Sequence, residues 1–175
     1  MRRRHDHGFS MIEVLVSILI VSLGILALSG LLVRASTLGK TAEFRGAASL
    51  LAADIADRIR ANVEGARNEK YDLTPTALAT GFPKAVTPTC DATACTPEQL
   101  AAKDVADWQA ALYANLPQGT GAVDYDATNH WADVWVMWRD PSAEDRSNEK
   151  IGVNMCSSQM AETEKASCMY FRVGR

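Results

Sequence analysis

Residues 8–33 read GFSMIEVLVSILIVSLGILALSGLLV. From Val14 to Val33 this stretch carries no charge, and its only polar side chains are three serines. Twenty such residues at about 1.5 Å each make about 30 Å of helix, the thickness of a bilayer core. Arg2–Arg4 precede the stretch, so the positive-inside rule places the N-terminus in the cytoplasm and everything after Arg34 on the far side. The sequence therefore predicts one membrane-spanning helix near the N-terminus.

The helical pattern continues beyond the apolar stretch. Apolar residues recur at helical spacing as far as Ile59, and charged residues lie mostly on the other side of the helix. No proline occurs before Pro75, so we expect one helix from about Phe9 to Asn62, with Gly65 as its stop. The first half of this helix would lie in lipid, and the second half would pack against a small domain.

The rest of the chain predicts one more helix and a small sheet. Residues 64–94 are expected to be mostly irregular, because prolines and a glycine punctuate them. The run Thr96–Gln99 has the residues of a capping box and starts a helix that Pro117 ends. The expected strands are residues 122–125, 131–138, 150–155 and 169–173, with a hairpin turn at 126–129. The predicted fold class is α+β, a long N-terminal helix with a transmembrane first half, packed on a small antiparallel sheet.

Four cysteines, Cys90, Cys95, Cys156 and Cys168, lie after the predicted membrane span. An even number of cysteines in an exported domain favours disulfides. Zinc is the competing reading, but neither close pair has C-x-x-C spacing and only one histidine follows the span. We therefore expect disulfides, no metal and no cofactor. Three connectivities stay open, and sequential pairing is favoured.

The remaining polar residues predict no enzyme active site. Asp104 and Asp107 are expected to be ordinary surface carboxylates, and Arg58 and Arg60 to form a solvated helix face. His130 has no neighbouring serine or cysteine that would make a catalytic set. The four tryptophans are expected to pack in the core or on the sheet. A formal net charge of −3 without a basic patch argues against a nucleic-acid partner.

A secretory signal peptide cut after Ser29 is an alternative reading of the N-terminus. It does not explain Glu13, because a charge inside a membrane span costs about 3 kcal/mol and normally has a partner. The helical pattern also runs through the proposed cut. Cleavage between Gly8 and Phe9 would instead create an amine four residues before Glu13.

The run Gly8–Glu13 before a long apolar helix resembles the leader junction of type IV prepilins and type II secretion pseudopilins. In that family a membrane peptidase, the prepilin peptidase, cuts after the glycine and methylates the new N-terminal phenylalanine. The resemblance implies cleavage after Gly8, N-methylation of Phe9, and a salt bridge between Glu13 and the Phe9 amine of a neighbouring subunit. It also implies three parts: a leader at 1–8, the transmembrane and assembly half of the first helix at 9–33, and a periplasmic head at 34–175.

Two further stretches, residues 51–62 and 95–117, are similar to minor pilins of the family called type IV pilus modification protein PilV. This resemblance implies a structural subunit that joins the pilus near its tip and helps to initiate assembly. Its partners would be other minor pilins and the major pilin. Before assembly it would lie in the inner membrane, held by residues 9–33 with the head in the periplasm, and afterwards in the pilus fibre at the cell surface. Gly30 departs from major pilins, which commonly carry proline there.

Two other functions stay open at this point. A minor pseudopilin of a type II secretion system would have much the same leader junction. A membrane-anchored enzyme or periplasmic binding domain would need a pocket with convergent polar groups, and the sequence offers no recognisable set of them.

Overall fold

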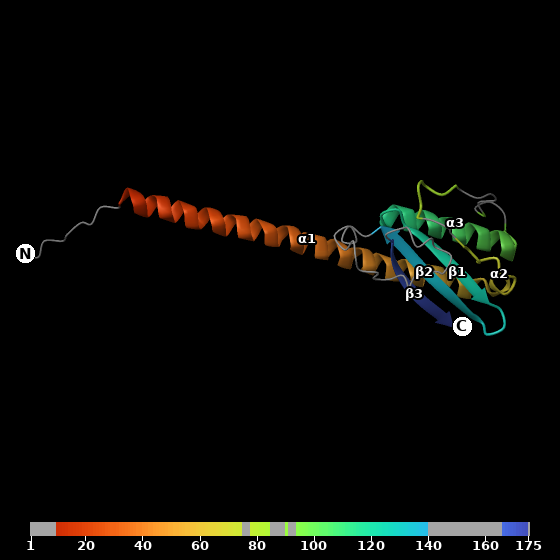
Figure 1. The fold of residues 1–175 in the computed structure, drawn as a ribbon. Helices are drawn as coiled ribbons and strands as arrows, with labels where there is room; N and C mark the ends of the chain where they lie inside the picture. The colour runs from red at the N-terminus through yellow and green to blue at the C-terminus, as the bar shows by residue number, and fades with distance from the viewer. Residues whose placement is uncertain (1–9, 75–77, 85–89, 91–93, 140–165, 175) are drawn as a thin grey trace, which may run out of the picture. The chain divides into compact units, whose positions relative to one another are not determined.

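The computed structural model describes residues 10–74, 78–84, 90, 94–139 and 166–174, and Figure 1 labels their helices and strands. Its elements, in chain order, are α1 (Met11–Ala61), α2 (Val63–Arg67), α3 (Pro97–Asn115), β1 (Thr120–Asp126), β2 (Trp131–Arg139) and β3 (Ala166–Gly174). A long apolar N-terminal helix and a small antiparallel sheet confirm the predicted α+β class. The expected strand at 150–155 lies outside the described residues. The chain divides into two compact units, Met1–Gly39 and Lys40–Arg175.

The second unit is built on a three-stranded antiparallel sheet in the order β1-β2-β3. Val134 in the middle strand lies opposite Val123 on one side and Phe171 on the other. The β1–β2 turn is held by Asp126, whose carboxylate accepts hydrogen bonds from the backbone N–H groups of Thr128 and Asn129, both at 2.9 Å. This register turns alternate side chains to opposite faces of the sheet.

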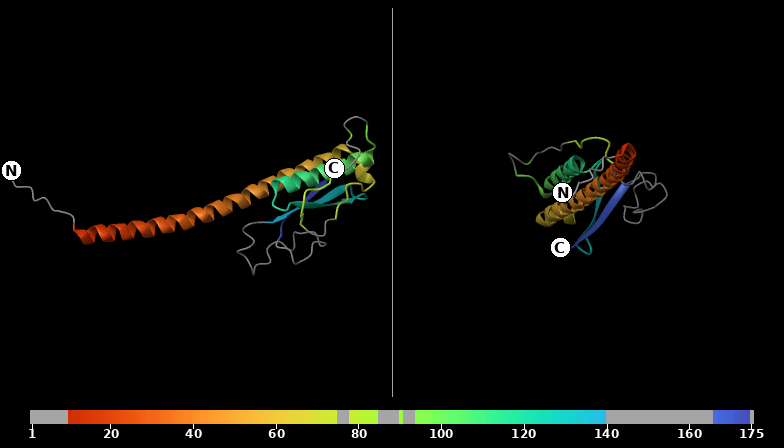
Figure 2. Two further views of the ribbon diagram at one scale, coloured as in Figure 1. Left: turned by 90° about the horizontal axis from the view of Figure 1, so that it is seen from above. Right: turned by 90° about the vertical axis from the view of Figure 1, so that its left-hand side faces the viewer.

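The C-terminal part of α1 and helix α3 cover one face of this sheet (Figure 2). Trp108 on α3 is fully buried and donates its indole N–H to the backbone carbonyl of Leu51 on α1, at 2.8 Å. The sheet contributes alternate β2 residues to the same core: Ala132, Val134, Val136 and Trp138. The expected packing of Trp108 and Trp138 in the core is thus confirmed.

The start of α3 also follows the sequence prediction. The Thr96 hydroxyl accepts from the Gln99 backbone N–H at 3.3 Å, and the Gln99 side chain accepts from the Thr96 N–H at 3.0 Å. Pro97 takes the first helical position, where its missing N–H is not needed. This reciprocal cap begins the helix at the expected residue.

The end of α1 lies one residue before the expected Asn62, but the expected role of Gly65 is wrong. Gly65 does not stop the helix: α1 ends at Ala61, and Gly65 is buried inside the short helix α2, which the sequence did not predict. The Asn62 side chain caps α2 by accepting from the Gly65 N–H at 3.2 Å and donates to the Pro97 carbonyl at 2.7 Å. A Cβ on residue 65 would lie 2.5 Å from the Asn62 amide nitrogen. Glycine is therefore needed at position 65 because the Asn62 side chain and the Pro97 carbonyl approach it closely, and not because it ends a helix.

Candidate functional site

The N-terminal part of α1 presents an apolar surface with no protein against it. Every side chain from Met11 to Val33 is exposed within the chain. By length and composition α1 can cross a membrane, and none of its most apolar window is buried. An exposed apolar surface of this extent needs lipid or other apolar helices as its surroundings.

The serines in this surface satisfy their own hydrogen bonds. The hydroxyls of Ser17, Ser22 and Ser29 donate to the carbonyls four residues earlier, at 2.7, 2.7 and 2.8 Å. Such back-bonding leaves no free hydroxyl donor, so these residues cost little in a membrane or against another helix. Within Met11–Val33, all of which the structure describes, the Glu13 carboxylate is therefore the one group that needs a partner.

Glu13 lies in the first turn of α1, where its negative charge interacts favourably with the helix dipole. Its backbone N–H donates to the Ser10 carbonyl at 3.0 Å. Its carboxylate has no hydrogen bond or ion pair within residues 10–74, 78–84, 90, 94–139 and 166–174. Gly8 and Phe9, the other expected site residues, lie outside these ranges. The site thus consists of an exposed carboxylate at the start of an apolar helix.

The cysteines fit an oxidised domain. Cys90 and Cys95 form a disulfide with an S–S distance of 1.98 Å. It closes a short loop directly before Thr96, the N-cap of α3. Cys168 on β3 is also disulfide-bonded, and Cys156, its expected partner, lies outside the described residues. The disulfide therefore holds Cys90 covalently next to the helix cap.

Arg58 and Asp104 are not the surface residues that the sequence predicts. Asp104 is 8% exposed, and its carboxylate accepts from the Tyr71 hydroxyl at 2.6 Å and from the Arg58 guanidinium at 3.1 Å. Arg58 also donates to Asp54 at 3.0 Å. Burial lowers the pKa of Arg58, but its bonds to the two carboxylates outweigh this effect and raise it. Burial and the bond to Asp104 both raise the pKa of the Tyr71 phenol. This cluster joins α1, α3 and the segment after α2.

A sequence signal for this cluster exists. The buried residues of α3 are Ala101, Asp104, Trp108 and Leu112, which recur every three or four positions. Asp104 therefore falls on the buried stripe of its own helix, and a carboxylate there needs a cationic or hydroxyl partner.

The other face of the sheet carries a second polar network. Both oxygens of Asp133 accept from Arg172, at 2.7 and 2.8 Å, and one also accepts from the Tyr170 hydroxyl at 2.7 Å. These bonds, first of all those from Arg172, hold the pKa of Asp133 below its usual range. The Arg172 guanidinium lies 4.5 Å from the centre of the Trp131 ring, and Trp135 packs on Tyr170. Among the described residues, these polar groups bond one another.

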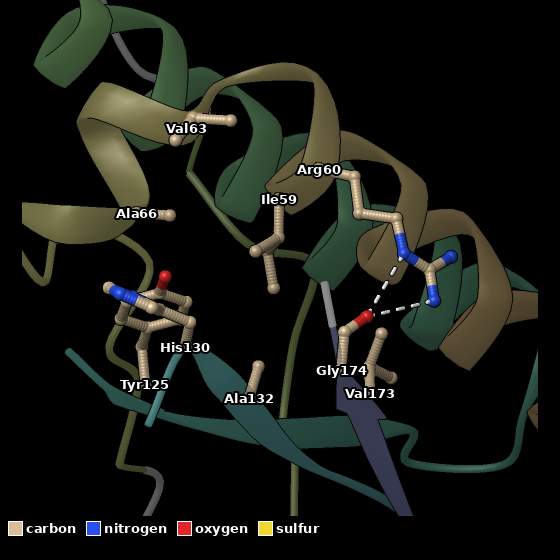
Figure 3. A pocket seen from close by; sticks show the side chains of 9 residues that line it. All are labelled: Ile59, Arg60, Val63, Ala66, Tyr125, His130, Ala132, Val173 and Gly174. Atoms are coloured by element: carbon tan, nitrogen blue, oxygen red, sulfur yellow. Dashed lines mark hydrogen bonds between the residues drawn. The ribbon is translucent and has the colours of Figure 1, made fainter. Parts of the chain in front are cut away.

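A small hollow lies in the second unit between the end of α1, α2 and the sheet (Figure 3). Tyr125 and His130 lie at one end of it, and Arg60 and Gly174 at the other. Its lining is mostly apolar. Within the described parts of the chain, no group of three or more His, Cys, Asp or Glu side chains could hold a metal ion.

The N-terminal residues match a known signal. Residues 3–29 match the prokaryotic N-terminal methylation motif, and no curated protein and no solved structure matches the chain. The motif marks a type IV pilin-like or pseudopilin subunit and implies processing by prepilin peptidase and assembly with other pilins. It points to a structural subunit rather than an enzyme, and with the apolar helix it fits a single-pass, membrane-anchored pilin.

Proposed function

We propose that the chain is a minor pilin of a type IV pilus, similar to the PilV family. It is a structural subunit that joins the fibre near the tip and helps to initiate assembly. The observation that carries this proposal is the exposed apolar segment Met11–Val33, whose one charged side chain, Glu13, has no partner among the described residues; Glu13 falls inside the methylation motif at residues 3–29.

The proposed maturation starts in the inner membrane. Residues 1–8 form the leader, and residues 9–33 anchor the precursor with residues 34–175 as a periplasmic head. Prepilin peptidase cuts between Gly8 and Phe9 and methylates the Phe9 amine. The mature subunit then leaves the bilayer by exchanging lipid for the apolar helices of its neighbours. This exchange is feasible because the serines of the helix satisfy their own hydrogen bonds.

Glu13 provides the register of the assembly. Because a buried charge is tolerated only next to an opposite charge, a subunit that moves into the fibre must place Glu13 near a cation. The Phe9 amine of the neighbouring subunit supplies it. If the helix shifts along its neighbour, both Glu13 and the Phe9 amine lose their partner. The charge pair therefore selects one position of the subunit along the fibre axis.

The test compares Glu13→Ala and Glu13→Gln with Ser17→Ala, which changes a self-bonded hydroxyl one turn further along the helix. We expect the three variants to insert in the membrane and to begin at methylated Phe9 in N-terminal sequencing. The ratio of the protein in sheared pili to that in the inner membrane should fall steeply for Glu13→Ala, because an unpaired buried amine costs about 3–5 kcal/mol. Glu13→Gln should also be defective, and Ser17→Ala should match the unchanged chain.

Three results would contradict the proposal. A mature protein that begins at Gly30 would indicate an ordinary signal peptide. An unchanged ratio of pilus protein to membrane protein for both Glu13 variants would contradict the charge pair. It would indicate a periplasmic domain that the helix only tethers to the membrane. A chain that is absent from sheared pili but required for protein secretion would be a pseudopilin.

A further inference from the structure

Arg34 is the first charged residue after the apolar segment Met11–Val33, and its side chain is exposed within the chain. Among the residues that the structure describes, it forms no hydrogen bond and no ion pair. The next acidic residue along α1 is Glu43, about 14 Å further along the helix axis. Glu43 already bonds Lys40 at 2.7 Å. Within the described part of the chain, the Arg34 guanidinium is therefore a cation without a counter-charge, at the end of an apolar surface.

The spacing of Glu13 and Arg34 matches the thickness of a bilayer core. The two residues are 21 positions apart on one continuous helix, which places them about 31 Å apart along its axis, and the apolar core of a bilayer measures about 30 Å. No charge lies between them. A helix that crosses the membrane therefore holds Glu13 at one boundary of the core and Arg34 at the other. Sliding in either direction draws one of the two charges into the core, which is unfavourable.

The boundary at which Arg34 lies offers one abundant anion, the phosphodiester of the lipid headgroups. The guanidinium is planar, and its N–H donors match phosphate oxygens in pairs. The apolar stem of an arginine side chain can lie along the helix and the lipid tails while its charged end reaches the headgroups. Attraction to anionic headgroups adds to these hydrogen bonds. A membrane lipid therefore supplies what the described part of the chain does not.

We propose that Arg34 binds the phosphate groups of lipids in the leaflet that faces the head, and that this contact fixes how deeply α1 lies in the membrane. The inference rests on the proposed function only in taking Met11–Val33 as a membrane anchor. The contact holds Glu13 at the opposite boundary of the core. Glu13 therefore enters apolar surroundings only when the subunit leaves the bilayer, at the step where its partner becomes available.

The first experiment measures the depth of the full chain in cells. Arg34→Leu lengthens the uncharged run to residues 14–39, which is about 39 Å of helix and about 9 Å longer than the core. A cysteine placed by Ser36→Cys reports the depth through its rate of reaction with a membrane-impermeant maleimide. We expect Arg34→Leu to lower this rate about ten-fold, because the cysteine then spends most of its time in the apolar core. The variant should still insert, because the change makes the helix more apolar.

Two variants are the controls for this measurement. Arg34→Lys keeps the cation and should leave the rate of labelling unchanged. Arg45→Leu removes an arginine from the second unit that is also exposed and has no ion pair among the described residues. It should leave the rate unchanged as well. Unchanged labelling for Arg34→Leu, or an equal fall for Arg45→Leu, would overturn the inference.

The second experiment identifies the ligand by solid-state NMR. The full chain, with ¹³C at the guanidinium carbon of its arginines, is placed in vesicles of phosphatidylethanolamine and phosphatidylglycerol. We expect dipolar coupling between an arginine carbon and lipid phosphorus that Arg34→Lys removes and Arg45→Leu does not. Vesicles of digalactosyl diacylglycerol contain no phosphorus, and inorganic phosphate added to them should give no coupling. Coupling to the added phosphate would identify a soluble ligand and overturn the lipid contact.

The remaining outcomes separate this inference from the proposed function. A fall in labelling for Arg34→Leu without any arginine–phosphorus coupling would mean that hydration alone holds Arg34 at the boundary, and would overturn the lipid contact. Neither measurement needs a pilus. A chain that is absent from sheared pili but gives the expected labelling and coupling would overturn the proposed function and support the lipid contact.

Discussion

Replacing Asp104 by alanine is expected to destabilise the second unit strongly, although the sequence places this residue among ordinary surface carboxylates. The change removes the 2.6 Å bond from the Tyr71 hydroxyl and the 3.1 Å bond from Arg58. The Tyr71 hydroxyl then has the Arg58 carbonyl at 3.3 Å as its acceptor, and exchanging a short bond to a carboxylate for this longer one in a buried site costs about 1–3 kcal/mol. Arg58 keeps Asp54 at 3.0 Å and is one-third exposed, which limits its share of the loss. The sum is about 2–4 kcal/mol of unfolding free energy.

The assay is thermal unfolding of the full chain in detergent, followed by near-ultraviolet circular dichroism. For a chain of this size each kcal/mol lowers the melting temperature by about 2–4 °C, so Asp104→Ala should lower it by about 5–15 °C. Tyr71→Phe leaves Asp104 paired with Arg58 and should cost about 1–2 kcal/mol. The double variant should show a coupling of about 1–2 kcal/mol between Tyr71 and Asp104.

Asp107→Ala is the matched control on the same helix. Its carboxylate lies 4.0 Å from Arg58 and 2.7 Å from Lys103, and its side chain is 47% exposed. An exposed pair of this kind contributes little, so the change should stay within about 0.5 kcal/mol. Equal effects for Asp104→Ala and Asp107→Ala, or no coupling with Tyr71→Phe, would refute the argument that the cluster is a buried structural unit.

Two further predictions concern the sheet. Gly121→Ala should destabilise the second unit by about 1–3 kcal/mol in urea unfolding, because the added Cβ would lie 2.3 Å from the Trp108 ring. Gly46→Ala meets no atom within 4 Å and should stabilise α1 by up to about 1 kcal/mol; similar losses for both would contradict the packing argument. Bonds from Arg172 depress the pKa of Asp133 in the folded chain. The stabilisation that this carboxylate provides is therefore fully present above its unfolded-state pKa of about 4. It is lost as the pH falls through the lower folded-state pKa. Asp133→Asn should therefore flatten the dependence of stability on pH below about 4, and an unchanged dependence would contradict this.

The predictions that depend on neighbouring residues could be made from the sequence. The apolar stretch at 14–33, the capping box at Thr96–Gln99 and the strand at 131–138 each follow from residues a few positions apart. Membrane insertion, helix capping and strand pleating act at that range, so their signals are contiguous in the chain. For this reason α1, α3 and β2 lie close to their expected bounds.

The tertiary structure alone decided which polar residues are buried and where the small hollow between the end of α1, α2 and the sheet lies. Arg58 and Asp104 are 46 residues apart, and Tyr71 and Asp104 are 33 apart. No local pattern brings such residues together, since their contact depends on how α1, α3 and the segment after α2 pack on one another. The same holds for Gly65, whose role depends on the approach of Asn62 and the Pro97 carbonyl. Burial depends on how the elements pack and not on the type of residue. A carboxylate on α3 therefore becomes a core residue only when a second element covers it.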